Sequence, residues 1–128
     1  MDSPINKKSI LIVEDDPVII SLINFMLKNM GYIVAGSAST AKDAIEAAQK
    51  LDPDLILMDI RMPVMSGLAA AEKIRALESA MNSHVPIIAI TANAMIGDKE
   101  KCLSAGIDDY ISKPYQPAAL INKIKNML

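Results

Sequence analysis

Apolar residues along the chain form two alternating patterns: short continuous runs of about four or five residues, and longer segments with apolar positions at helical spacing. The short runs are bounded by polar residues, glycine or proline, which is typical of buried strands. They predict strands at residues 9–13, 33–35, 55–58, 86–90 and 109–112, each followed by a helix. Strands that are apolar on both faces predict a parallel sheet covered by helices on both sides. The predicted fold class is therefore α/β, with a single doubly wound, five-stranded parallel sheet and five helices.

The helix boundaries carry recognisable start and stop signals. Asp16-Pro17 predicts a cap followed by a proline at the first helical position, Thr40 predicts a second cap, and Gly31 and Gly106 are placed to end helices. The third helix is expected over residues 68–77, and Pro117 is expected to start the last one. The expected inward positions are Ile19, Leu22, Ile23, Met26 and Met30 in the first helix, Ala41, Ala44, Ile45 and Ala48 in the second, and Leu120, Ile121, Ile124 and Leu128 in the last.

Length and composition restrict the class of protein. With 128 residues and 52% hydrophobic residues, the chain predicts one compact domain over residues 1–128, with residues 1–8 as a short N-terminal extension. The net charge of -2 and the pI near 5.3 give no basic surface, so direct nucleic acid binding is not expected. The apolar runs are too short to cross a membrane, and the start lacks the apolar core of a signal peptide, so a cytoplasmic protein is expected. A single cysteine, Cys102, cannot form an internal disulfide.

Charged residues follow three of the predicted strands directly. Glu14 and Asp15 follow the first strand, Asp59 follows the third, and Lys113 follows the fifth. In an open parallel sheet, residues just beyond the carboxyl ends of the strands converge on one crevice, where such folds bind ligands. Carboxylates that face a lysine in such a crevice indicate a metal-assisted phosphoryl site.

These residues also resemble a known family, the receiver domains of two-component and phosphorelay signalling. The resemblance covers about residues 9–128 and rests on five features in order: the acidic pair in VEDDP, the aspartate in LMDIRMPVMSG, the threonine in AITANA, the aromatic in DDY and the lysine in SKP. It implies a flavodoxin-like (βα)5 fold. The Glu-Asp pair and the stretch from TANA to SKP are most similar to receivers of hybrid histidine kinases, so both a stand-alone regulator and the receiver of a longer kinase fit the sequence.

The resemblance implies a phosphoacceptor and a metal site. Asp59 would accept the phosphoryl group, and Mg²⁺ would be bound directly by Asp15 and Asp59, by the backbone carbonyl of Arg61, and through water by Glu14. A phosphoryl group adds roughly two negative charges beside carboxylates that already repel one another, and a divalent cation relieves that repulsion.

The resemblance also implies how phosphorylation is sensed. Lys113 would bind the phosphoryl oxygens, and Pro114 would aim the lysine through a cis peptide bond. The Thr91 hydroxyl would move toward the phosphoryl group, and Tyr110 would fill the space behind it. The consequence would be repacking of the face formed by the fourth helix, fifth strand and fifth helix.

The implied function is a phosphorylation-activated switch, not an enzyme beyond its own phosphorylation and dephosphorylation. It would take its phosphoryl group from a phosphohistidine of a histidine kinase or histidine phosphotransfer protein, signal to a downstream effector protein, and exist as a monomer or a phosphorylation-dependent dimer. Two alternatives are a receiver that docks without phosphorylation and a Mg²⁺-dependent aspartyl-phosphate phosphatase, although Arg61 occupies the position where such phosphatases carry a second acid. A nucleotide or flavin binder is disfavoured because acids, not glycines, follow the first strand.

Three polar or reactive residues have simpler interpretations. Asp16 is expected to cap a helix and not to bind metal, because it precedes a proline. His84 is interpreted as a surface histidine in a polar loop, and Cys102 as a structural thiol on a helix.

Overall fold

The computed structural model describes residues 7–60, 67–81, 84–91, 96–113 and 115–128. Strands and helices alternate along these residues. The strands are β1 (Ser9–Val13), β2 (Ile33–Ala38), β3 (Leu55–Asp59), β4 (Ile87–Thr91) and β5 (Asp109–Ser112). The helices are α1 (Pro17–Asn29), α2 (Ala41–Leu51), α3 (Gly67–Met81), α4 (Ile96–Ser104) and α5 (Pro117–Met127).

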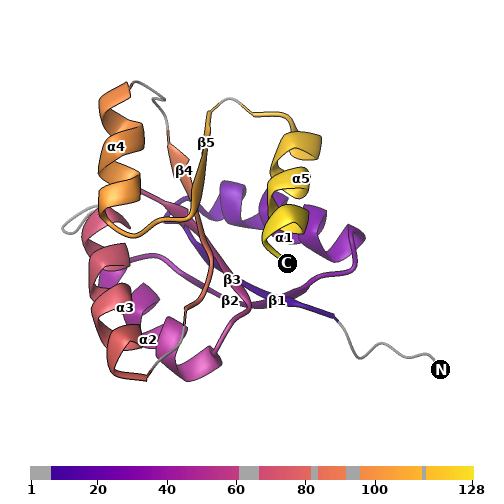
Figure 1. The fold of residues 1–128 in the computed structure, drawn as a ribbon. Coiled ribbons are helices and arrows are strands. Elements are labelled where there is room, and N and C mark those ends of the chain that lie inside the picture. The colour runs from indigo at the N-terminus through magenta and orange to yellow at the C-terminus, as the bar shows by residue number, and fades with distance from the viewer. Residues whose placement is uncertain (1–6, 61–66, 82–83, 92–95, 114) are drawn as a thin grey trace.

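The strands form one sheet in the order β2-β1-β3-β4-β5, and every neighbouring pair is parallel. The chain moves from β1 outward to β2 and then returns past β1 to β3, so the direction of winding reverses between β1 and β3. Figure 1 shows the result: α1 and α5 cover one face of the sheet, and α2, α3 and α4 cover the other. The predicted doubly wound α/β fold is confirmed.

The core has two halves, one on each face of the sheet, because successive residues of a strand point to opposite faces. Leu11 and Ile56 pack on the side of α2, α3 and α4, whereas Ile12 and Leu57 pack on the side of α1 and α5. All four side chains are fully buried. Continuous apolar runs are therefore required in the central strands, since both faces are covered.

The predicted helix signals act as expected. The Asp16 carboxylate accepts a hydrogen bond from the Val18 backbone N–H at 2.9 Å, and the Thr40 hydroxyl accepts one from the Asp43 N–H at 3.1 Å. Gly31, with a φ of 88°, follows the end of α1 in the left-handed region that favours glycine.

Three residues that were predicted to face inward are exposed. In α1, Ile23 is buried, but Leu22 and Met30 are 64% and 45% exposed. Helix α1 is apolar around most of its circumference, and only one side of it can face the sheet. Leu128, expected inward, is 37% exposed because it follows the last residue of α5.

Several elements are longer than predicted. Strand β2 continues to Ala38 instead of ending at residue 35, and α3 runs from Gly67 to Met81 instead of over residues 68–77. Small and polar residues at these ends give no apolar signal, but their backbone continues the pairing or the helix. Among the described residues, no helix has both the length and the apolar character needed to cross a membrane.

Candidate functional site

The parallel register of the central strands brings the predicted acids together. Val13 pairs with Met58, so the residues that follow them, Glu14 and Asp59, lie at the same rim of the sheet. The Glu14 backbone N–H also donates to the Ala38 carbonyl at 2.9 Å, which holds this segment beside the end of β2. The rim lies between β1 and β3, where the winding reverses, the usual place for a ligand in this class of fold.

Three carboxylates form a cluster at this rim. Oxygen atoms of Glu14, Asp15 and Asp59 all lie within 4.8 Å of one another. Glu14 and Asp59 are 2% and 5% exposed, whereas Asp15 is exposed. Two negative charges at this separation repel by about 3 kcal/mol at an effective dielectric of about 20, so the cluster favours a bound cation or proton.

Glu14 shows this electrostatic cost most clearly. Its Oε2 accepts weak hydrogen bonds from the Asp15 and Asp16 backbone N–H groups, both at 3.2 Å. Its Oε1 is buried and has no hydrogen-bond partner among the described residues. Burial raises the pKa of Glu14 from 4.5 to about 7; the Asp16 N–H and Lys113 oppose this shift, and the charge of Asp59 adds to it.

Lys113 and Thr91 lie at the same rim. The Lys113 backbone N–H donates to the Thr91 carbonyl at 2.7 Å, which continues the β4–β5 pairing one residue beyond the strand. The Lys113 ammonium lies 3.8 Å from Asp59 Oδ2. Thr91 is 2% exposed at the end of β4, and Tyr110 is half-buried on β5. The structure thus gathers Thr91 and Lys113 around the three carboxylates.

Helix α3 begins against the phosphoacceptor candidate. The Gly67 backbone N–H donates to the Ile60 carbonyl at 3.0 Å. A Cβ atom at Gly67 would lie 2.7 Å from both the Asp59 carbonyl oxygen and Ile60 Cα, so only glycine permits this close approach.

The donor set fits a divalent cation. Three clustered carboxylates, one with an oxygen that lacks a partner within the described part of the chain, provide the hard oxygen ligands that Mg²⁺ prefers. Asp16 is not part of this set, because its carboxylate caps α1 as predicted. The predicted carbonyl ligand of Arg61 and the predicted cis bond at Pro114 lie outside the described residues.

His84 and Cys102 also follow the prediction, with one addition. The His84 side chain is 58% exposed, and its Nε2 lies 2.8 Å from Asp108 Oδ1, a pairing that the sequence did not indicate. Cys102, on α4, is 1% exposed and belongs to the half of the core on the side of α2, α3 and α4.

One feature near the site was missed from the sequence: an apolar groove between α1 and α5. Its volume is about 800 Å³, and its lining includes Leu22, Phe25, Tyr115, Ile121 and Lys125. Phe25 is 69% exposed. Burial, and to a lesser extent the charge of Glu14, raise the pKa of Tyr115, which lines this groove. The signal in the sequence was the excess of apolar residues around α1.

A family model, the response regulator receiver domain, matches residues 10–125. The chain belongs to this family. It is a receiver domain of two-component phosphorelay signalling, and receiver domains are phosphoacceptor domains and not classical enzymes.

Similar proteins and solved structures support the assignment to the receiver-domain family. The chain is 39% identical to hybrid signal transduction histidine kinase I of Dictyostelium discoideum over 94% of its own length but only 7% of that protein. It is 42% identical, with a TM-score of 0.83 and coverage of 94% and 97%, to the receiver domain of sensor histidine kinase PA1611 from Pseudomonas aeruginosa, which was crystallised with a magnesium ion in its active site cleft. It is 30% identical, with a TM-score of 0.85 and coverage of 94% and 88%, to the receiver of Saccharomyces cerevisiae Ssk1, crystallised with the histidine phosphotransfer protein Ypd1.

Proposed function

We propose that Asp59 accepts a phosphoryl group from a phosphohistidine of a partner protein. The P–N bond of the phosphohistidine breaks as a P–O bond to the Asp59 carboxylate forms, and the imidazole nitrogen keeps the electron pair. The observation that supports this most directly is the Lys113 ammonium at 3.8 Å from Asp59 Oδ2, beside two further carboxylates. The chain would catalyse only this transfer and the later hydrolysis of its own aspartyl phosphate.

The residues at the rim have separate parts in this proposal. Asp15 and Asp59 would hold Mg²⁺ directly and Glu14 through water, with the Arg61 carbonyl as a further ligand. Bound Mg²⁺ would supply positive charge against the phosphoryl oxygens. Lys113 would provide the remaining positive charge, and the Thr91 hydroxyl would donate a hydrogen bond to a phosphoryl oxygen.

Intact mass spectrometry with a small-molecule phosphodonor tests this function. Wild type is expected to gain one phosphoryl group in the presence of Mg²⁺ and none in excess chelator, whereas Asp59→Asn gains none. Asp43→Asn, which changes an exposed acid in the first turn of α2, is the matched control and should behave as wild type. Uptake by Asp59→Asn at the wild-type rate and at one defined site would exclude Asp59 as acceptor. Failure of wild type under every condition would favour the docking-only alternative.

We further propose that the donor protein docks in the groove between α1 and α5. The segment that carries Asp15 leads directly into α1, and the segment after Lys113 leads through Tyr115 into α5. A partner seated in the groove would therefore lie beside the acceptor. Exposed Leu22 and Phe25 would provide the apolar anchors that protein partners commonly bury. A helical surface that presents its phosphohistidine next to an apolar ridge fits this arrangement.

The docking proposal predicts that changes in the groove slow phosphoryl transfer from a protein donor but not from a small-molecule donor. Replacing Leu22 and Phe25 by alanine should slow transfer from a phosphorylated histidine phosphotransfer protein by about tenfold or more, since each anchor contributes about 1 kcal/mol or more. Transfer from the small-molecule donor should be unchanged. Leu103→Ala, on α4 and 52% exposed, is the control and should leave both rates unchanged. Equal slowing with both donors, or equal slowing by the control, would contradict the assignment.

We propose that a downstream effector reads the face formed by α4, β5 and α5. This face carries exposed Leu103, half-buried Tyr110 and the ion pair of Lys123 with Asp109 at 3.2 Å. Tyr110 would change position with Thr91 when Asp59 is phosphorylated. The domain boundaries of 1–128, the cytoplasmic location and the choice between a monomer and a phosphorylation-dependent dimer stay predictions.

A further inference from the structure

A second polar network lies in the half of the molecule away from the acidic rim, and Arg75 of α3 is its centre. The Arg75 Nε donates to the Gly106 carbonyl at 2.8 Å, in the turn between α4 and β5. Its Nη1 donates to the Val85 carbonyl at 2.7 Å, just before β4. Its Nη2 donates to Asp108 Oδ2 at 2.6 Å, just before β5. The Arg75 side chain therefore joins α3 to two segments: the residues just before β4, and the turn between α4 and β5.

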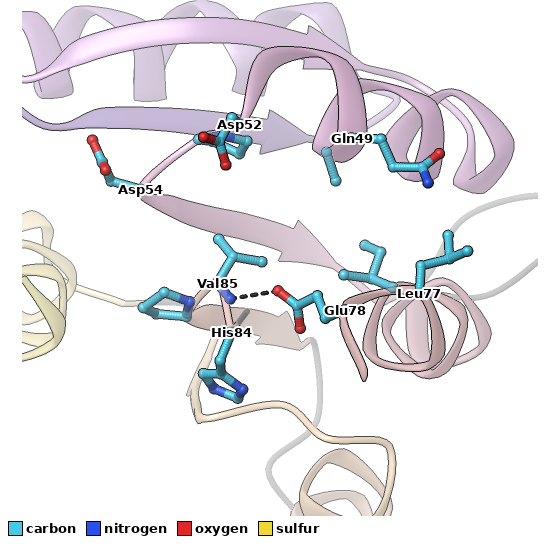
Figure 2. Close-up of a pocket in the computed structure, with 11 residues that line it drawn as sticks. Gln49, Asp52, Asp54, Leu77, Glu78, His84 and Val85 are labelled. Atoms are coloured by element: carbon cyan, nitrogen blue, oxygen red, sulfur yellow. Dashed lines mark hydrogen bonds between the residues drawn. The ribbon is translucent and has the colours of Figure 1, made fainter. Parts of the chain in front are cut away.

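The partners of Arg75 are themselves held in place. Asp108 Oδ2 also accepts a hydrogen bond at 2.8 Å from the backbone N–H of Ile87, the first residue of β4. Glu78 pairs with Arg75 and accepts from the Val85 N–H, the bond drawn in Figure 2. The Arg75 and Glu78 side chains are only 16% and 12% exposed. Because the charges are paired and largely removed from water, the geometry of the network is fixed more tightly than that of a surface ion pair.

The turn after α4 is shaped around Arg75. Gly106 has a φ of 92°, in the left-handed region, and a Cβ atom there would lie 2.7 Å from Arg75 Cγ. Arg75 thus packs directly on the turn as well as binding its carbonyl. The cavity of about 230 Å³ next to this network, shown in Figure 2, is lined in part by Glu78, His84 and Asp54, each of which has a hydrogen-bond partner within the fold.

Helix α3 therefore contacts both the proposed phosphoacceptor Asp59 and the turn between α4 and β5. Its first residue, Gly67, packs against the backbone of Asp59, and Arg75, two turns later, binds Gly106 and Asp108 in the turn between α4 and β5. A helix is a rigid element, so a displacement at its first turn is carried along its axis.

We propose that Arg75 is a positioning residue that couples the phosphoacceptor to the turn between α4 and β5. Phosphorylation at Asp59 shifts the start of α3, and Arg75 transmits that shift to Gly106 and Asp108, which border the face formed by α4, β5 and α5. Without the Arg75 side chain, Asp59 still takes up its phosphoryl group, but the response of the turn is reduced. This inference rests on the proposed function of Asp59.

Amide chemical shifts in ¹H–¹⁵N NMR spectra of the full chain provide the test. Beryllofluoride with Mg²⁺ serves as the probe for the phosphoryl group. In wild type, the probe is expected to shift the amides of Asp59 and Thr91 at the rim and those of Gly106 and Asp108 at the turn. In Arg75→Met, the rim shifts should persist, whereas the turn shifts should fall by about twofold or more. Lys73→Met, an exposed lysine of the same helix, is the matched control and should retain both sets.

Each result has a defined meaning. If Arg75→Met does not fold, Arg75→Lys replaces it, because lysine keeps the charge but cannot reach three separated acceptors; loss of the turn shifts is then expected in Arg75→Lys. Turn shifts of wild-type size in the folded variant would overturn the proposal, as would rim shifts in wild type without turn shifts. A merely structural role would lower the melting temperature but leave the turn response intact. Absence of rim shifts in wild type would instead refute the proposed function of Asp59, and the inference with it.

Discussion

The buried carboxylate of Glu14 is expected to make the stability of the metal-free protein depend on pH. Its pKa is about 7 in the folded protein, against an ordinary value of 4.5. A group whose pKa is raised by folding contributes its full stability below the unfolded pKa, and this contribution is lost as the pH rises through the folded pKa. The interval between 4.5 and about 7 corresponds to about 3 kcal/mol. Ionised Glu14 therefore lowers the free energy of unfolding above pH 7.

Replacing Glu14 by glutamine removes the charge and keeps the shape. The glutamine carbonyl can still accept hydrogen bonds from the Asp15 and Asp16 N–H groups. Its amide nitrogen would replace Oε1, which in wild type has no partner in the described part of the chain, and can donate to the neighbouring carboxylates. In the absence of metal, Glu14→Gln should be more stable than wild type by about 2–3 kcal/mol at pH 8.5, and by less than about 1 kcal/mol at pH 5.

Urea unfolding followed by far-ultraviolet circular dichroism, in excess chelator from pH 5 to 8.5, measures this difference. Glu46→Gln, an exposed glutamate of α2, is the control and should follow wild type at every pH. If the difference between Glu14→Gln and wild type does not change with pH, burial of Glu14 does not raise its pKa and the electrostatic description of the rim is wrong.

Four further substitutions test the packing around the site and the cap of α1 by urea unfolding. Gly67→Ala should destabilise by about 1–3 kcal/mol, because its Cβ would meet the Asp59 carbonyl oxygen at 2.7 Å; an effect below about 0.5 kcal/mol would contradict the close packing. Asp16→Ala should cost about 1 kcal/mol through loss of the cap of α1, and no loss would mean that the cap bond does not stabilise the helix. Leu57→Ala should cost about 2–5 kcal/mol, whereas Leu22→Ala should change stability by less than about 0.5 kcal/mol; similar losses at both positions would mean that α1 packs differently.

Much of the site could be predicted because it depends on local pattern and strand register. The apolar runs locate the strands, and the residue after a parallel strand has little freedom in where it lies. Asp59 and Lys113 therefore reach the same rim whatever the details of side-chain packing. The same holds for Asp16, whose role as a cap follows from the proline that comes next.

Side-chain packing between distant segments could not be predicted in this way. In α1, Leu22 and Ile23 are both apolar neighbours, and only the position of the sheet decides that Ile23 is buried and Leu22 exposed. Arg75 binds partners 10 to 33 residues away in sequence, and no periodic pattern marks them. The raised pKa of Glu14 depends on the depth of burial, which a sequence does not give.

Strand order explains why the rim needs a cation beyond its lysine. The adjacent central strands β1 and β3 supply all three carboxylates, while Lys113 comes from β5, two strands away from β3. Only the length of its side chain brings the ammonium within 3.8 Å of Asp59. One lysine cannot neutralise three carboxylates, and with its pKa raised to about 7, Glu14 is expected to hold a proton below that pH when metal is absent. A proton and a divalent cation therefore relieve the same repulsion, so Mg²⁺ affinity is expected to fall as the pH drops below 7.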